Sequence, residues 1–307
     1  MCRMIFRSSR NRFGKEGENI KKLKKKIEKE IEKELERQQG GMDRKEFEAM
    51  KNRVQTADCM DILQRLPSES IDLVIADPPY FRMKGEFDFT FRTEEEYLAW
   101  CKKWVAECHR VLKPDGAFYC FGSSLMIDRL SVRVLDQFDW IKRNLIVWNY
   151  HTGRPGKAAF RNEAEFLWFY AKPYHVIDKD AVRIPYFPGY EKDKRHNPKG
   201  KSCGNVWECS RVLPNFREAT GHPTQKPEKL AERMILASCR PGGLVFIPFA
   251  GSGSEMAACI RNGRNFIATE INPSYVEDII VPRMWDILLG RDTPEKEEPA
   301  GNAPGEG

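Results

Sequence analysis

The 307-residue sequence contains no apolar run approaching 18 residues and no C-x-x-C pair. A membrane-spanning helix needs about 20 consecutive apolar residues, so we expect no membrane segment. The N-terminus carries basic residues but no apolar stretch of signal-peptide length, which argues against secretion. The nine scattered cysteines suit reduced thiols better than a disulfide framework. Together these absences indicate a cytoplasmic protein.

The sequence also lacks a common metal motif and a large excess of one charge. Cys203 and Cys209 lie between His196 and His222, but their spacing matches no common zinc finger. We therefore expect no metal ion. The net charge of +6 permits a polyanionic partner without requiring one.

Both ends of the chain differ in composition from its middle. Residues 20–37 carry apolar side chains every three or four positions, which predicts an amphipathic helix within a basic N-terminal region, residues 1–45. This helix could rest on the protein body or on a second copy, or it could contact DNA phosphates as a basic arm. Residues 291–307 are rich in Pro, Gly and Glu, which is typical of a disordered tail.

Strand and helix patterns alternate through the rest of the chain, except between residues 151 and 215, where the regularity fades. Strands separated by helices of this length imply parallel crossovers, so we expect an α/β fold with a doubly wound sheet. The expected strands are 53–58, 71–77, 116–122, 143–150, 243–249 and 265–271, and the expected helices are 59–67, 93–112, 124–136, 226–239 and 253–262.

A glycine-rich turn, Gly251-Ser252-Gly253-Ser254, lies between an expected strand and an expected helix. Glycines let a ligand approach the backbone, and the start of a helix offers unpaired N–H groups. Glu270 ends the next strand, where a carboxylate can accept hydrogen bonds from both hydroxyls of a ribose. The turn lacks the third glycine of a dinucleotide fingerprint and the G-K-[ST] of a Walker loop. A ligand with one adenosine and no polyphosphate fits best, although such turns also serve packing alone.

A second unusual turn, Asp77-Pro78-Pro79-Tyr80, follows an expected buried strand. Asp77 would face the crevice where open α/β sheets bind ligands, the proline carbonyls stay free as acceptors, and Tyr80 supplies a flat ring. An exocyclic amino group on a planar base needs this set, because its N–H hydrogens are accepted while its ring is stacked. Hydrogen bonds to Asp77 and the Pro78 carbonyl would localise the nitrogen lone pair for attack on a methyl sulfonium. The alternative is a structural turn closed by a packing tyrosine.

The sequence D-P-P-Y at 77–80 and P-F-A-G-S-G-S at 248–254 resembles the motifs of S-adenosylmethionine-dependent DNA methyltransferases that modify adenine N6 or cytosine N4. The segment G-H-P-T-Q-K-P at 221–227 resembles a third motif of this family. The catalytic motif precedes the cofactor loop, as in the permuted beta subgroup. The resemblance covers about residues 53–282, and it implies a Rossmann-like methyltransferase sheet with circularly permuted motif order.

The resemblance also implies a division of the chain and roles for individual residues. Residues 46–150 would form the catalytic half, 216–290 the cofactor-binding half and 151–215 an inserted target-recognition region. Ile247 departs from the subgroup, which usually carries Asp there, and this puts in doubt how the methionine ammonium is held. The implied catalytic residues are Asp77, Pro78, Pro79 and Tyr80, and the implied cofactor contacts are Asp58, Phe249, Gly251, Ser252, Gly253, Glu270, His222, Thr224 and Lys226.

DNA would need a surface of its own, because a duplex hides the target amine and the base must be flipped into the site. Basic and aromatic side chains are interleaved between residues 183 and 201, which makes the insert the candidate. A Gly-hinged basic loop at 151–161 would border the flipped base or the cofactor. A solvated loop without DNA contacts is the alternative. The residues expected to bind DNA are Arg154, Lys157, Arg183, Lys192, Lys194, Arg195, Lys199 and Lys201.

These observations predict a site-specific methyltransferase that acts on double-stranded DNA. Asp at the first position of the catalytic motif is associated with adenine within the family, so adenine N6 is the expected target and cytosine N4 the alternative. A DNA-binding relative with impaired catalysis and an enzyme acting on RNA are also compatible with the sequence. A cognate restriction endonuclease and a homodimer stay open as partners.

Overall fold

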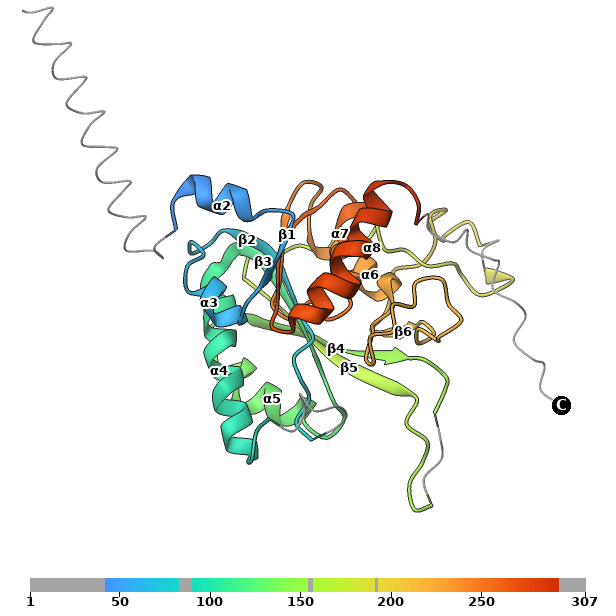
Figure 1. Ribbon diagram of the computed structural model, residues 1–307. Helices are drawn as coiled ribbons and strands as arrows, with labels where there is room; N and C mark the ends of the chain where they lie inside the picture. Colours follow the sequence, from blue (N-terminus) through green and yellow to red (C-terminus); the bar gives the residue numbers. More distant parts are fainter. Residues whose placement is uncertain (1–41, 83–89, 154–156, 191–192, 293–307) are drawn as a thin grey trace, which may run out of the picture.

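An eight-stranded sheet forms the centre of the computed structural model, which describes residues 42–82, 90–153, 157–190 and 193–292 (Figure 1). The strand order is β1-β8-β7-β2-β3-β5-β4-β6. Neighbouring strands pair in parallel except where β5 is involved, since β5 runs against both β3 and β4. The strands are β1 (Arg53–Thr56), β2 (Ile71–Ala76), β3 (Leu112–Gly122), β4 (Ile141–Asn149), β5 (Ala164–Ala171), β6 (Val206–Glu208), β7 (Leu244–Ile247) and β8 (Asn265–Glu270).

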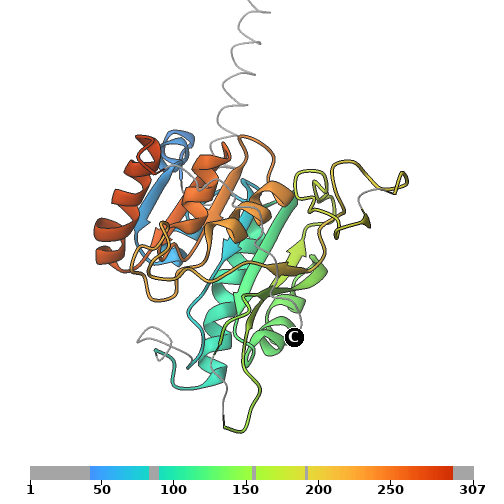
Figure 2. The ribbon, with the colours of Figure 1, turned by 90° about the vertical axis from the view of Figure 1, so that its right-hand side faces the viewer.

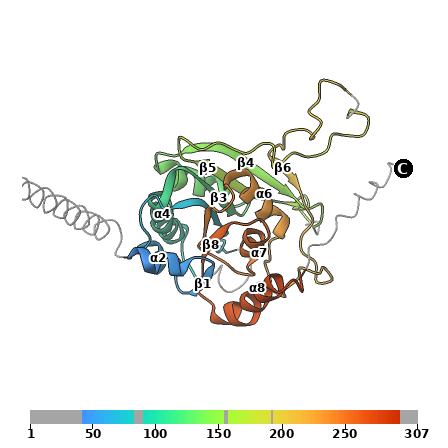
Figure 3. The same ribbon diagram turned by 90° about the horizontal axis from the view of Figure 1, so that it is seen from above.

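Helices cover both faces of the sheet, as the view from above shows (Figure 3). One apolar core packs a face of the sheet against α2, α3, α4 and α5. A second core packs the other face against α6, α7, α8 and the π-helix before α8. The bounds are α2 (Arg44–Met50), α3 (Cys59–Leu63), α4 (Glu94–Val111), α5 (Ile127–Arg133), the 3-10 helix η2 (Leu135–Gln137), α6 (Glu228–Ser238), α7 (Ser254–Arg261), the π-helix η4 (Tyr275–Ile280) and α8 (Val281–Leu288).

Local sequence accounts for the elements that carry the site. All six residues of β2 are buried, as expected for a parallel strand that is covered on both faces. The helix α4 begins after Thr93, whose side chain accepts the Glu96 N–H, and three glutamates in its first turn complement the helix dipole. The strand β2 therefore ends abruptly at the proline turn, and the chain returns along the sheet through α4.

The structure confirms the α/β class and the expected strands and helices, with ends shifted by a few residues. It differs between residues 151 and 215, where β5 and β6 join the same sheet although the sequence predicts no regular element there. The sheet is therefore mixed rather than wholly parallel. The strand β5 escapes prediction because it lies on the sheet as one arm of an antiparallel pair with β4, without a helical crossover to signal it.

The reversal of β5 sends the following chain to the far edge of the sheet. Lys172 and Tyr174 donate their N–H groups to the carbonyls of Gly116 and Pro114, at the start of β3. Residues 172–205 therefore leave the sheet at the amino edge of the parallel strands. The connection between β4 and β5 lies at the carboxyl edge instead. Figure 2 shows these two segments extending from opposite parts of the molecule.

Two expectations fall on parts of the chain that the structure does not describe. The helix expected at 20–37 and most of the expected tail lie outside the described residues. Within the described ranges, no helix is both long enough and apolar enough to cross a membrane.

Candidate active site

Four turns at the carboxyl edge of the sheet form the candidate active site. The strands β1, β8, β7 and β2 are parallel neighbours, so their carboxyl ends lie side by side. The chain leaves these ends at Asp58, Glu270, the glycine loop and Asp77 respectively. The two turns singled out in the sequence, 77–80 and 251–254, therefore lie next to each other in space.

Asp77 lies in a polar cluster around the buried Lys226 side chain. Its Oδ2 accepts a hydrogen bond from Lys226 Nζ at 2.8 Å, and its Oδ1 accepts one from the Tyr80 hydroxyl at 2.9 Å. The same ammonium pairs with Glu165 Oε2 at 3.4 Å. Lys226 Nζ also lies 5.2 Å from the ring centre of Tyr80 and 5.3 Å from that of Phe121. One ammonium is thus surrounded by two carboxylates and two aromatic rings.

The pKa shifts in this cluster follow from burial and from the central charge. Burial raises the pKa of the Asp77 carboxyl, and the charge of Lys226 opposes that rise. Burial also disfavours the charged form of Lys226, but Asp77 and Glu165 outweigh it and raise the pKa of the ammonium. Lys226 therefore keeps its proton at neutral pH and favours the ionised form of Asp77.

The Tyr80 hydroxyl has a structural role that the sequence did not indicate. The sequence suggested only a stacking ring, whereas the hydroxyl donates to Asp77 and lies 3.4 Å from Glu165. Burial and both carboxylates raise the pKa of the Tyr80 hydroxyl well above its usual value, so it stays a donor. Tyr80 thereby fixes the orientation of the Asp77 carboxylate.

The glycine loop adopts a backbone that other residues rarely reach. Gly251 has φ +51° and Gly253 has φ +76°, both in the left-handed region. A Cβ atom on Gly251 would lie 3.3 Å from Cε1 of His222, so the loop packs closely on the 221–227 segment. These two glycines bring the loop backbone next to the residues expected to hold the cofactor.

Glu270 fixes the glycine loop to the end of β8. Its Oε2 accepts the Gly251 N–H at 2.8 Å, and its Oε1 accepts the Asn272 N–H at 2.9 Å. A carboxylate offers about four acceptor positions, so capacity remains for the ribose hydroxyls expected from the sequence.

Residues 221–227 connect the two turns directly. The Ser254 hydroxyl donates to the Lys226 carbonyl at 2.7 Å, while the Lys226 side chain reaches Asp77. The peptide group and the side chain of one residue therefore join the glycine loop to the catalytic turn.

Two side chains set the shape of this segment. Gln225 Oε1 accepts the Thr220 N–H at 2.9 Å and the Thr220 hydroxyl at 2.8 Å. The His222 ring packs edge-on against Tyr275. Burial and the nearby charge of Lys226 lower the pKa of His222 to about 4, so the ring is neutral at physiological pH. Thr224 lies between these residues, and its N–H donates to His222 Nδ1.

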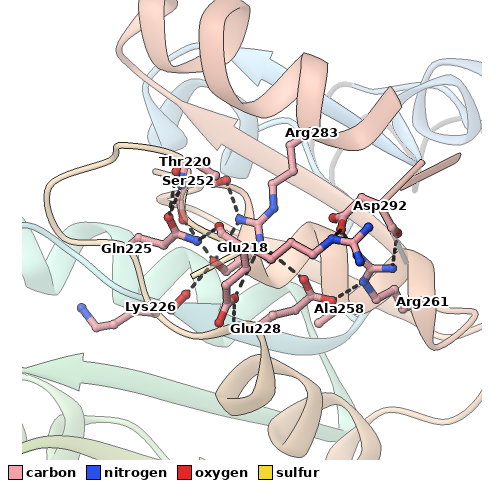
Figure 4. A network of polar contacts seen from close by, with 12 residues as sticks. Glu218, Thr220, Gln225, Lys226, Glu228, Ser252, Ala258, Arg261, Arg283 and Asp292 are labelled. Atoms are coloured by element: carbon pink, nitrogen blue, oxygen red, sulfur yellow. Dashed lines mark hydrogen bonds and ion pairs between the residues drawn. The ribbon is translucent and has the colours of Figure 1, made fainter. Parts of the chain in front are cut away.

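Arg283 of α8 supports the glycine loop from within the protein (Figure 4). Its buried guanidinium donates to the Ser252 carbonyl at 3.0 Å and to the Ser254 hydroxyl at 3.2 Å. It also pairs with Glu228 at 3.3 Å, and Glu228 in turn pairs with Arg261. This network ties the loop to α6, α7 and α8.

Asp58 and Phe249 lie at the same edge and also make structural contacts. Asp58 caps α3 by accepting the Met60 N–H at 2.8 Å. The Phe249 ring packs against Trp100 and Trp104 of α4. Their positions suit the expected cofactor contacts, which stay predictions.

Three members of the site were not foreseen: Glu165, Phe121 and Arg283. Glu165 lies near the start of β5, where an acid in an otherwise apolar strand was the available signal. The charge of Arg283 gave no signal of its own, because its contacts come from elements far away in the chain. Periodicity does not show such long-range pairing.

The expected DNA-binding residues fall into two groups. Lys157 lies at the carboxyl edge, in the connection between β4 and β5, whereas residues 183–201 lie in the segment that leaves the opposite edge. Arg154 and Lys192 are outside the described residues. Lys157 therefore lies in a connection at the same edge of the sheet as Asp77.

Several basic side chains of residues 183–201 are engaged within their own loop. Arg183 donates to Asp180 and to the Gly200 carbonyl, which closes the loop. Arg195 pairs with Asp193. The remaining contacts are Lys199 with Asp180 at 3.4 Å and Lys201 over the Phe187 ring at 4.0 Å, whereas Lys194 is exposed.

The histidines and cysteines weighed as a zinc site do not converge. His196 stacks on Tyr186, while His222 packs near Tyr275 at the glycine loop. Across the described ranges, no group of three or more His, Cys, Asp or Glu side chains is arranged to hold a metal ion.

Comparison with known proteins places residues 71–281 within a family model described as DNA methylase, N6_N4_Mtase. The chain is 36% identical over 233 residues to the DNA adenine methyltransferase YhdJ of Escherichia coli K12, covering 72% of this chain and 78% of that protein. Two solved structures share the fold. The PvuII cytosine-N4-specific DNA methyltransferase has a TM-score of 0.59 at 22% identity, over 76% of this chain and 90% of that one. The M1.HpyAVI–SAM complex has a TM-score of 0.52 at 24% identity, over 75% and 98%.

Replacing Arg283 with methionine should lower the free energy of unfolding by about 3 kcal/mol, because buried acceptors and Glu228 lose a charged partner. Urea denaturation followed by tryptophan fluorescence measures the change. Arg291→Met is the matched control, since the exposed Arg291 side chain lies 3.7 Å from the Asp286 carboxylate. The control should change stability by less than about 0.5 kcal/mol. Equal effects of the two substitutions would contradict the supporting role of Arg283.

Proposed function

Because the chain belongs to the N6/N4 DNA methylase family, we propose that it transfers a methyl group from S-adenosylmethionine to N6 of an adenine flipped out of duplex DNA. The observation that carries the proposal is the link made by Lys226. Its side chain binds Asp77 of the catalytic turn, and its carbonyl accepts from Ser254 of the glycine loop. A methyl donor bound at the glycine loop would therefore lie beside a target base bound at the catalytic turn.

The residues of the glycine loop fit the cofactor of this family. Gly251 leaves open the space that a Cβ would fill next to His222, and Glu270 keeps acceptor capacity for a ribose. When bound, S-adenosylmethionine supplies a methyl group on a positively charged sulfur. Asp58, Phe249, Ser252 and Thr224 complete the proposed surroundings of the cofactor.

The catalytic turn would prepare the amine of the target base. Asp77 accepts one hydrogen bond on each oxygen, from Lys226 and from Tyr80, which leaves further acceptor positions for an N–H of the base. The Pro78 carbonyl would accept the second N–H. These bonds localise the lone pair on nitrogen, and Asp77 needs its negative charge to make them. Lys226 therefore acts by keeping Asp77 ionised in a buried site.

Adenine is favoured over cytosine by two arguments. Asp77 occupies the first position of the catalytic motif, where the family associates Asp with adenine. The curated relative YhdJ is named a DNA adenine methyltransferase. Cytosine N4 is the second candidate, because a structure of the same fold is cytosine-N4-specific.

The connection between β4 and β5 is the part of the insert best placed to meet the DNA around the flipped base. It lies at the carboxyl edge with Asp77 and carries Lys157 and Arg161, the latter paired with Glu163 at 2.7 Å. Phe160 in the same connection is fully exposed, which makes its ring available for stacking on a base. Residues 183–201 would then contact the duplex only at a distance from the target.

Expression in a host without DNA methylation should produce N6-methyladenine within one recognition sequence. Single-molecule sequencing of the host genome reads base, position and sequence together. The Asp77→Ala chain should leave the genome unmodified while still binding S-adenosylmethionine in calorimetry. Methylated cytosine in place of methylated adenine would identify cytosine N4 as the target. An unmodified genome with the natural chain would favour a catalytically impaired DNA-binding protein.

Replacing Lys226 with methionine should shift the acidic limb of the kcat/KM profile to higher pH by about one unit or more. Burial already raises the pKa of Asp77, and loss of the ammonium removes the charge that opposes this rise. Activity would then be lost at a pH where the natural enzyme still holds an ionised Asp77. Lys226→Arg should restore the limb, and exposed Lys103→Met is the neutral control. An unshifted limb in Lys226→Met would refute the role assigned to the ammonium.

The double substitution Lys157→Ala and Arg161→Ala should raise KM for duplex DNA about tenfold and reduce the salt slope of binding by about 2, since two phosphate contacts are lost. The matched pair Lys194→Ala and Lys199→Ala lies in the segment from the far edge and should change KM by less than about threefold. Methylation kinetics at low and high salt measure both. A larger effect of the second pair would return DNA recognition to residues 183–201.

A further inference from the structure

Glu255 is a buried acid whose role the contacts above leave unexplained. It is the second residue of α7, directly after the glycine loop, and it is 5% exposed. Apart from its own backbone N–H, no group in the described ranges donates a hydrogen bond to its carboxylate or forms an ion pair with it. Buried carboxylates are rarely left unpaired, because the loss of hydration is costly. Among the described residues, the Glu255 carboxylate therefore keeps acceptor capacity that a bound ligand could use.

The two cationic side chains near Glu255 already pair with other groups. Asp77, Lys226 and Arg283 lie within electrostatic reach of its carboxylate. Lys226 binds Asp77 and Glu165, while Arg283 binds the glycine loop and Glu228. Burial and the charge of Asp77 raise the pKa of Glu255 to about 7, although Lys226 and Arg283 act in the opposite direction.

We propose that the Glu255 carboxylate binds the α-ammonium group of the methionine part of S-adenosylmethionine. This inference rests on the proposed function and adds a residue to it. Ile247, at the end of β7 before the glycine loop, is fully buried and apolar, so it offers no acceptor for a cation there. Glu255 follows the glycine loop directly and supplies a negative charge next to it.

The ammonium is a better partner than the sulfonium for chemical reasons. An ammonium has three N–H donors, which satisfy a carboxylate that lacks donors, whereas a sulfonium has none. A second free carboxylate at the sulfonium would also compete with the target amine for the methyl group. Asp77 avoids this because both of its oxygens already accept hydrogen bonds.

Calorimetry with three ligands tests the proposal on the whole chain. S-adenosylmethionine carries both cations, S-adenosylhomocysteine carries only the ammonium, and 5′-methylthioadenosine carries neither. Glu255→Gln should weaken binding of the first two by about tenfold or more and leave the third unchanged. Glu255→Asp should recover part of the loss. Glu277→Gln, on the exposed side of the π-helix, is the matched control and should bind all three like the natural chain.

The possible results separate the two proposals. A natural chain that binds none of the three ligands would overturn the proposed function and this inference with it. A natural chain that binds S-adenosylmethionine supports the proposed function, and the variants then decide the role of Glu255. Unchanged binding in Glu255→Gln, a loss confined to S-adenosylmethionine, or an equal loss for all three ligands would each overturn the ammonium contact.

A stability measurement excludes a merely structural role. An acid kept for a ligand destabilises the free protein, because it is buried without a partner. Glu255→Gln should therefore melt at the same temperature as the natural chain or higher when no ligand is present. A clear drop in melting temperature would instead assign Glu255 to folding and overturn the proposal.

Discussion

The ammonium of Lys226 is the interaction on which the rest of the site depends. Two partly buried carboxylates, Asp77 and Glu165, share this one cation. Burial raises the pKa of Asp77 and the charge of Lys226 opposes that rise, so the ammonium favours the ionised form of Asp77. The carbonyl of the same residue accepts the Ser254 hydroxyl. Lys226 thus binds Asp77 through its side chain and the glycine loop through its carbonyl. The ionisation of Asp77 is thereby coupled to the position of the loop.

Sheet topology explains how distant segments meet at this residue. The strands β2 and β7 are direct neighbours in the sheet although α4, β3, β4, β5 and α6 lie between them in the chain. Their parallel pairing aligns the two turns at one edge, which is where open α/β sheets bind ligands. The buried Arg283 guanidinium then fixes the glycine loop by donating to the Ser252 carbonyl, next to the apolar core formed with α8.

The parts of the site that sequence reasoning recovered are those with local causes. The left-handed backbone of Gly251 and Gly253 follows from the absence of a Cβ, and the turn after β2 follows from its two prolines. The strands and helices on either side were visible as apolar periodicity. Each of these features is encoded within about ten residues.

The parts that were missed depend on tertiary pairing. Lys226 was expected to contact a cofactor, but its bond to Asp77 requires the meeting of two segments far apart in the chain. Glu165 entered the site because β5 runs antiparallel, which composition does not reveal. The sequence shows that residues 183–201 are basic, but it does not show from which edge of the sheet this segment begins. Composition identifies which side chains are charged, whereas topology decides what they face.

The reversal of β5 has a consequence for how such a protein can diversify. Residues 172–178 leave the sheet at its amino edge, on the opposite side from Asp77 and the glycine loop. Insertions, deletions and new surface charges in that stretch would leave the reacting atoms undisturbed. The direction of β5 thus separates a part of the chain on which the site depends from a part whose sequence can change without altering the site.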